Sequence, residues 1–188
     1  HVAMLLKAKP EVVSFHFGLP RQEVVDAIKN AGIFVQSSAT TSAEARRLEA
    51  AGVDAVIAQG TEAGGHRATF TGVDMSMQAG LFSLLPQIVD AVRVPVIAAG
   101  GVCDGRTVAA AFMLGASAVQ MGTAFLLCDE ANVRPAHREA LTQADESCTV
   151  VTDVISGRPA RYIRNKLVDD LLESGLQPLP IPQQLSLT

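Results

Sequence analysis

Five short apolar segments recur along the 188-residue chain at a nearly regular interval and limit its possible folds. They cover residues 12–18, 33–36, 55–58, 94–99 and 118–121. The strands would start near positions 12, 33, 55, 95 and 118, at intervals of about 21, 22, 40 and 23 residues, and the short intervals match the period of a strand–helix unit. Apolar residues at helical spacing between them predict helices over 22–30, 42–51, 81–92 and 105–114. Apolar strands that alternate with helices predict a parallel sheet covered by helices.

Two α/β architectures fit this pattern, a doubly wound open sheet and a (β/α)8 barrel. The candidate functional residues follow strand ends, and the last two strands run into Gly100-Gly101 and Gly122-Thr123. Loops after the final two strands form the phosphate site of many barrels. No G-x-G-x-x-G follows any strand, which disfavours a dinucleotide-binding open sheet. The pattern therefore favours the barrel.

The number of units is too small for a complete barrel, which takes about 250 residues. The chain carries five units and does not begin with Met. We therefore expect roughly three preceding units to be missing from this sequence. The fold class that follows is α/β, a (β/α)8 TIM barrel represented by its last five βα units and a C-terminal extension. Residues 1–147 would form the barrel part, with its strands 4–8, and residues 148–188 the extension.

The extension differs in composition from the repeating part. Residues 156–166 are basic and rich in turn formers, residues 167–174 suit a short helix, and Pro178, Pro180 and Pro182 interrupt regular structure. The basic stretch could meet an anionic cofactor, cover one end of the domain, or be a solvated connector.

Composition excludes several classes of function. The net charge is −4 and aromatic residues make up 4% of the chain, with no Trp, so nucleic acid and anionic membrane surfaces are poor partners. No apolar run reaches the roughly 18 residues of a membrane span. Cys103, Cys128 and Cys148 are widely spaced, which indicates neither a disulfide framework nor a zinc site and suits the reducing cytoplasm.

The stretch from Gln59 to Arg67 combines a strand end, glycines and a histidine. Gln59 could hydrogen-bond a heterocycle or a ribityl chain, or simply brace the loop. Gly64 and Gly65 could offer N–H groups to a ligand or only turn the chain. The pKa of a histidine suits proton transfer near neutral pH, so His66 is the candidate general base. We expect Arg67 to disfavour a positive charge on the imidazole.

Two further turns suit an anion. Gly100-Gly101 and the segment Gln120, Met121, Gly122 and Thr123 each follow a strand and would offer backbone N–H groups, with the Thr123 hydroxyl as a further donor. On neighbouring strands they would hold one phosphate from two sides. The alternative for each is a tight turn without a ligand. No cluster of metal-ligating residues stands out.

These segments closely resemble the nitronate monooxygenase family, formerly called 2-nitropropane dioxygenases. The resemblance rests on residues 51–67, 95–102, 120–125 and 156–161, in the order of the family's motifs. It implies an FMN-dependent TIM-barrel oxidoreductase that uses O2 to convert nitronates and nitroalkanes into carbonyl compounds and nitrite. It also implies that Gln59 and Gly64 contact the flavin, that Gly101 and the Gln120–Thr123 turn hold the FMN phosphate, and that His66 is the catalytic base.

Two other functions remain open from the sequence. One is an FMN-dependent enoyl-acyl-carrier-protein reductase of the same superfamily, which would take hydride from a nicotinamide cofactor. The other is a flavin- or phosphate-binding barrel module without chemistry of its own. A homodimer is a candidate assembly in each case.

Overall fold

The structure is a computed structural model that describes residues 2–72 and 74–186. Contacts along the chain define two compact units. The first holds the chain up to Glu62 together with Ala68–Gln120, and the second holds Ala63–Arg67 and the chain from Met121 onward. The predicted division after residue 147 concerns which residues belong to the barrel, and it stays a prediction.

The first unit contains a five-stranded parallel sheet in the order β1-β2-β3-β5-β6. Each of the five predicted strands is present, with ends shifted by a few residues. The strands are β1 (Val12–Phe15), β2 (Phe34–Ala39), β3 (Ala55–Gln59), β5 (Val96–Ala99) and β6 (Ala118–Gln120). Because neighbours in sequence are neighbours in the sheet, with helices between them, the prediction of consecutive βα units is confirmed.

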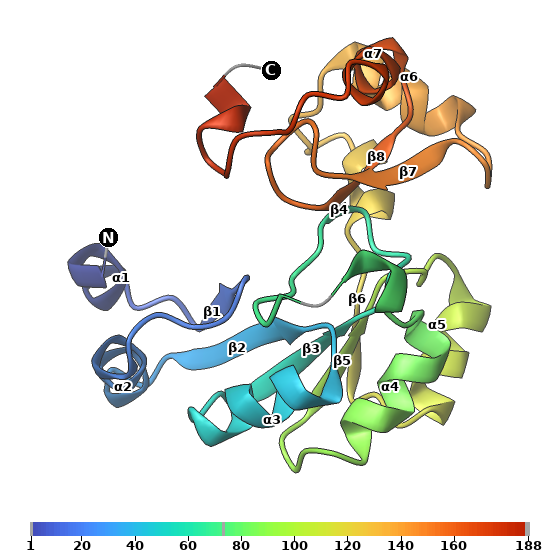
Figure 1. Cartoon of the computed structure of the whole chain (residues 1–188). Helices are drawn as coiled ribbons and strands as arrows, with labels where there is room; N and C mark the ends of the chain where they lie inside the picture. The colour runs from blue at the N-terminus through green and yellow to red at the C-terminus, as the bar shows by residue number, and fades with distance from the viewer. Residues whose placement is uncertain (1, 73, 187–188) are drawn as a thin grey trace. The chain divides into compact units, whose positions relative to one another are not determined.

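Helices cover one side of this sheet, where Figure 1 draws α2 to α5. Their bounds are α2 (Gln22–Asn30), α3 (Ser42–Ala50), α4 (Leu81–Val89) and α5 (Gly105–Met113), and a shorter helix α1 (Val2–Ala8) precedes them. In α4 the apolar residues Leu81, Leu84, Leu85 and Ile88 recur at helical spacing and are buried. A short 3-10 turn, η1 (Met75–Met77), precedes α4.

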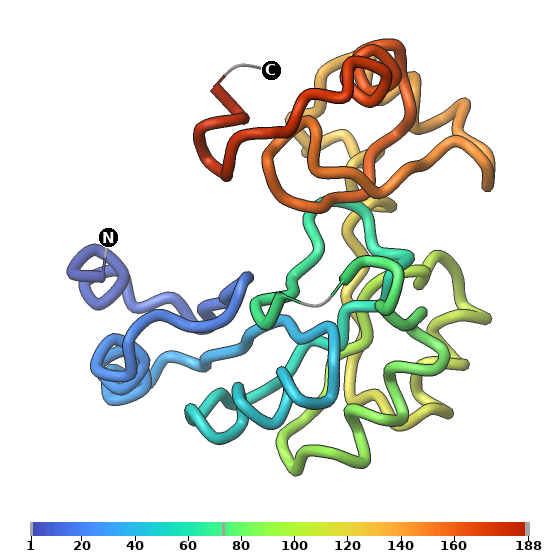
Figure 2. The backbone as a smooth tube through the Cα atoms, viewed as in Figure 1, coloured from blue at the N-terminus to red at the C-terminus, as the bar shows by residue number. Residues whose placement is uncertain are grey.

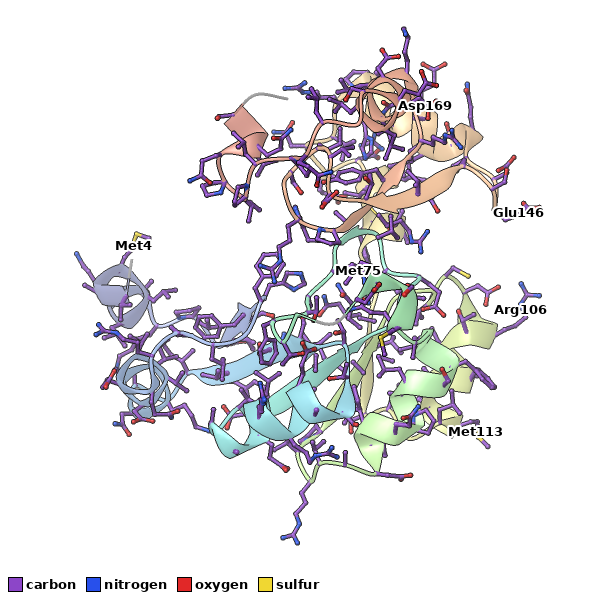
Figure 3. All side chains as sticks on the ribbon, viewed as in Figure 1. Met4, Met75, Arg106, Met113, Glu146 and Asp169 are labelled. Atoms are coloured by element: carbon purple, nitrogen blue, oxygen red, sulfur yellow. The ribbon has the colours of Figure 1, made fainter. Side chains whose placement is uncertain are left out.

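The core of the first unit centres on β3, in which all five residues are buried. The strands at the β1 edge of the sheet are less covered. Val12 of β1 and Phe34 of β2 are register partners, and they are 47% and 41% exposed. On the outer surface of α5, Arg106 and Met113 project away from the strands (Figure 3), and Met113 is 87% exposed. The sheet is therefore well packed against its helices and less covered at its β1 edge.

N-cap residues determine where the helices α5 and α3 begin. Asp104 accepts hydrogen bonds from the N–H groups of Arg106 and Thr107 and completes a capping box for α5, as expected of an N-cap aspartate. Thr41 caps α3 by accepting from the N–H of Glu44. The Glu44 carboxylate, however, accepts from the N–H of Thr40 and not from that of Thr41. Thr41 and Glu44 have the spacing of a capping box, but only the half made by the Thr41 side chain is formed.

The second unit contains an antiparallel sheet in the order β4-β8-β7. In Figure 2 the part of this unit from Met121 onward runs from yellow to red, and β4 belongs to the green part of the trace. The elements are β4 (Gly65–His66), η2 (Thr123–Leu127), α6 (Pro135–Gln143), β7 (Thr149–Thr152), β8 (Ala160–Ile163), α7 (Lys166–Glu173) and η3 (Gln184–Ser186). The basic stretch 156–166 contains β8, so the connector reading is wrong for Ala160–Ile163. The predicted helix over 167–174 is confirmed as α7, displaced by one residue.

Candidate active site

Four predicted site residues of the first unit lie at the carboxyl edge of its sheet. Gln59 ends β3 and pairs with Ala99 of β5, and Ala99 pairs with Gln120 of β6. Gly100 and Gly101 follow Ala99 with φ of +97° and +68°. Side chains rarely adopt these dihedrals, so the turn itself requires glycine at both positions. The residues that follow β5 and β6 therefore leave the sheet at the same edge, as predicted.

Gln59 is 7% exposed, and its side chain holds together the two ends of a loop. Its Oε1 accepts a hydrogen bond of 2.9 Å from the N–H of Ala68. This bond joins the two ends of the chain segment that carries the glycines and His66. The loop-bracing alternative is thus observed for the amide oxygen, and the predicted flavin contact of Gln59 stays a prediction.

Glu62 has a structural role in the first unit. Both of its carboxylate oxygens lie 2.9 Å from the N–H of Leu81, the first residue of α4, whose N-cap Gly80 has no side chain to do this. A Cβ added to Gly80 would come within 2.8 Å of Glu62 Oε1, and one added to Gly101 within 3.4 Å of Glu62 Cβ. The absence of a side chain at Gly80 therefore leaves room for this carboxylate, whose negative charge stabilises the N-terminus of the helix.

His66 belongs to the second unit, where β4 pairs with β8 and places it opposite Ala160. Its Nε2 lies 2.8 Å from Oγ of Ser156, a residue with no exposed surface. The Ser156 hydroxyl donates to the carbonyl of Arg158 at 2.9 Å, and the Tyr162 hydroxyl donates to Ser156 Oγ at 3.1 Å. His66 is thus held by a buried serine that is itself held from two directions.

The surroundings of His66 favour its neutral form. Burial lowers the pKa of His66 below its ordinary value of 6.5, and the positive charge of Arg158 lowers this pKa further. We expected Arg67 to supply that charge, and this was wrong: the charge that acts is that of Arg158. Arg67 is 1% exposed, and its N–H donates to the carbonyl of Pro159 at 2.8 Å, next to the β4–β8 pairing.

The remaining predicted residues also lie in the second unit. A Cβ added to Gly64 would come within 2.9 Å of Thr123 Oγ1, so these two predicted residues are neighbours. Gly65 has φ of +75° and continues into the β4 pairing. Met121 and Gly122 connect β6 to η2, and a Cβ on Gly122 would meet no atom within 4 Å.

The structure thus groups the predicted residues in two sets. The first unit holds Gln59, Gly100, Gly101 and Gln120, and the second holds Gly64, Gly65, His66, Met121, Gly122 and Thr123. Reasoning from the sequence missed Ser156, Arg158 and Tyr162 as neighbours of His66. Their only signal was the Ser-Gly-Arg segment that contributes to the family resemblance.

Across residues 2–72 and 74–186, no group of three or more His, Cys, Asp or Glu side chains is arranged to hold a metal ion. No helix within the same ranges has the length and apolarity needed to cross a membrane.

Comparison with known proteins identifies the family of the chain. The family model for nitronate monooxygenase matches residues 1–188. The chain is 43% identical to a probable nitronate monooxygenase of Bacillus subtilis and 48% identical to a nitronate monooxygenase of Pseudomonas aeruginosa. These alignments cover 100% and 94% of this chain, and 54% and 50% of the relatives. The chain therefore spans about half the length of the curated relatives it matches.

Solved structures give the same result. Nitroalkane oxidase from Streptomyces ansochromogenes superposes with a TM-score of 0.92 at 44% identity, over 100% of this chain and 54% of that one. FabK from Thermotoga maritima superposes with a TM-score of 0.81 at 36% identity, over 98% and 55%. Fold and neighbours define an α/β protein that covers part of a TIM barrel. The chain belongs to the nitronate monooxygenase family.

Proposed function

We propose that the protein is an FMN-dependent oxidoreductase of the nitronate monooxygenase type. It would oxidise nitronates and nitroalkanes with O2 to carbonyl compounds and nitrite. Family membership supports the reaction class, and the His66–Ser156 hydrogen bond is the observation that carries the assignment of a base. A small-molecule substrate and a cytoplasmic location go with this proposal.

The residues proposed to bind FMN fit a phosphate. Within the described part of the chain, the backbone N–H groups of Gly101, Gly122 and Thr123 donate no hydrogen bond to protein, and all three residues are exposed. Such donors at a turn suit an anion, and the space beside Gly122 would admit one. Gly100, Gln120 and Met121 would complete the turns that hold the phosphate, while Gln59, Gly64 and Gly65 would contact the rest of the flavin.

Bound FMN would supply the acceptor for substrate electrons and the group that reacts with O2. The protein's own contribution begins with the tautomer of His66. We assign the single proton of the Ser156 hydroxyl to the Arg158 carbonyl, so that Ser156 Oγ accepts from His66 Nε2. A neutral His66 then carries its proton on Nε2, and Nδ1 holds the lone pair.

This tautomer makes Nδ1 of His66 the proposed base. The α C–H bond of a neutral nitroalkane breaks, its electron pair moves into the nitronate, and the proton passes to Nδ1. The lowered pKa of His66 keeps the ring neutral at physiological pH and ready to accept that proton. The Nε2–H bond to Ser156 keeps the ring from rotating, so one nitrogen faces the reaction throughout.

The test compares a neutral nitroalkane with its preformed nitronate, using nitroethane and ethyl nitronate. Nitrite release in the presence of O2 is measured for the unaltered protein and for His66→Asn. Since only nitroethane needs a base, the variant should lose about 10²- to 10⁴-fold on nitroethane and largely keep its rate on ethyl nitronate. Equal losses on both substrates would remove the base assignment.

The same preparation separates the other two functions. NADH oxidation that depends on an enoyl thioester, with no nitrite from either nitro compound, would indicate the reductase. FMN retained without turnover of any of these substrates would indicate a binding module.

A further inference from the structure

Glu44 is a buried carboxylate at the edge of the sheet where the site residues lie. It belongs to the first turn of α3, which begins three residues after β2 ends, and its side chain has no exposed surface. β2 pairs with β3, the strand that ends in Gln59. Glu44 therefore lies at the carboxyl ends of the strands, although neither its type nor its position in a helix marks it as a site residue.

The carboxylate of Glu44 joins two distant segments of the first unit. Oε2 accepts from the N–H and the hydroxyl of Thr40, at 2.7 and 2.8 Å. Oε1 accepts four bonds of 2.8 to 3.1 Å from residues 25 to 27 positions further along, namely Thr69 Oγ1, Phe70 N, Thr71 N and Thr71 Oγ1. Donors saturate both oxygens, so the carboxylate holds residues 69–71 against the start of α3.

This set of donors requires an ionised carboxylate. Burial alone would raise the pKa of Glu44, but the hydrogen bonds from Thr40, Phe70 and Thr69 outweigh burial and hold this pKa below its ordinary value. A buried carboxylate without such partners would be costly. The segment 69–71 and the charge of Glu44 therefore stabilise each other.

Residues 69–71 come immediately after the segment that carries His66. Ala63–Arg67 leaves the first unit after Glu62 and returns to it at Ala68. Before this segment, Glu62 binds the N-terminus of α4. After it, Gln59 binds Ala68, and Glu44 binds residues 69–71. Glu44 makes more of these bonds than Gln59 or Glu62.

We propose that Glu44 is a positioning residue that, by fixing residues 69–71, limits the conformations of the loop carrying His66. The part of this inference that concerns catalysis rests on the proposed function. Glu44 acts through the loop and takes no part in the chemistry itself. If Glu44 only stabilised the fold, its replacement would lower the rates with nitroethane and ethyl nitronate equally, although only nitroethane needs a base.

The test uses Glu44→Gln in the purified protein. The amide nitrogen would face either the Thr40 donors or those of residues 69–71, so one group of bonds is lost. The rate with nitroethane should fall at least tenfold more than the rate with ethyl nitronate, while the FMN content stays unchanged. Hydrogen–deuterium exchange should rise at Phe70 and Thr71 and also across residues 63–68.

Asp54→Asn provides the matched control. Asp54 also accepts a backbone N–H, that of Val35 at 2.8 Å, and it accepts from Lys29 Nζ at 2.7 Å, but it precedes β3 and lies at the opposite end of that strand. This variant should lower stability without separating the two substrates. Thr71→Val removes one donor to Glu44. It should also lower the rate with nitroethane more than the rate with ethyl nitronate, but by less than Glu44→Gln does. This variant replaces Glu44→Gln in the test if Glu44→Gln does not fold.

Two outcomes would overturn the inference. One is an equal loss on nitroethane and ethyl nitronate, and the other is faster exchange confined to Thr40 and residues 69–71, with residues 63–68 unchanged. If the unaltered protein turns over neither nitro compound, the proposed function fails, and the exchange measurement alone then decides whether Glu44 controls the loop.

Discussion

Ser156 Oγ lies 2.8 Å from His66 Nε2 across 90 residues of sequence. The pairing of β4 with β8 brings the two residues together, since His66 is opposite Ala160 and Ser156 precedes β8 by four residues. A tight antiparallel pair thus fixes the direction of an imidazole ring. The position of the proposed base therefore depends on Ser156 and β8 as much as on the glycine-rich segment that contains it.

Ser156→Ala should therefore separate the two substrates. Without the serine oxygen, Nε2 loses its acceptor and the ring can change tautomer, so fewer molecules hold the lone pair on Nδ1. The rate on nitroethane should fall about tenfold or more, while the rate on ethyl nitronate changes little. Tyr162→Phe is the control, because it removes one bond to Ser156 and leaves the His66 contact in place. A Ser156→Ala protein with unchanged nitroethane turnover would contradict the tautomer assignment.

The acid limb of the pH profile should respond to Arg158. Because burial and the Arg158 charge lower the pKa of His66, kcat/KM for nitroethane should decline only below pH 6.5, as His66 takes up a proton. Arg158→Gln removes the charge, so the pKa of His66 rises and the decline moves to higher pH. Arg161→Gln is the control, since Arg161 lies three residues further on, in β8, and binds Thr149 Oγ1 through its guanidinium. A profile unmoved by Arg158→Gln would exclude this electrostatic effect.

The lowered pKa of His66 also makes the stability of the fold depend on pH. A histidine whose pKa is lower in the folded state takes up its proton more readily when unfolded, so it destabilises the fold as pH falls below 6.5. This cost should be smaller in Arg158→Gln. Unfolding by denaturant at pH 7.5 and pH 5 would measure the difference, and an equal loss in both proteins would contradict it.

Local sequence patterns predict most of the secondary structure of the first unit. The interval between apolar segments located its five strands, and Asp104 and Thr41 marked the first turns of α5 and α3. These features depend on residues within a few positions of each other. The Glu44 carboxylate departs from its local pattern: its spacing from Thr41 is that of a capping box, but donors from residues 69–71 determine where it points.

The second unit was harder to predict because its contacts are not local. Thr149–Thr152 consists only of β-branched residues, which is a usable strand signal that we did not apply. Nothing near β8, however, indicates that it pairs with the two residues Gly65–His66. The dependence of His66 on Ser156 and Arg158 is a product of that pairing, so a local reading of the sequence could not find it.

Gly60→Ala should destabilise the first unit without any direct effect on a ligand. The added Cβ would come within 2.6 Å of the backbone nitrogen and Cβ of Leu81 and would also collide with the Glu62 carboxylate that caps α4. Such overpacking costs about 1 to 3 kcal/mol. Gly105→Ala, where a Cβ meets nothing within 4 Å, should leave the free energy of unfolding nearly unchanged. Equal stability of the two variants would show that the Glu62 contact yields easily.

Gly122→Val should weaken FMN binding without lowering stability, and it tests the proposed phosphate turn. A side chain at Gly122 enters open space in the protein, so folding should be unaffected, but it would fill the space proposed for the FMN phosphate. The variant should unfold at the same denaturant concentration as the unaltered protein and lose its flavin on gel filtration, measured by visible absorption. Gly105→Val places the same side chain at another open glycine, at the start of α5, and should keep its flavin. A yellow Gly122→Val protein with an unaltered flavin spectrum would remove Gly122 from the proposed site.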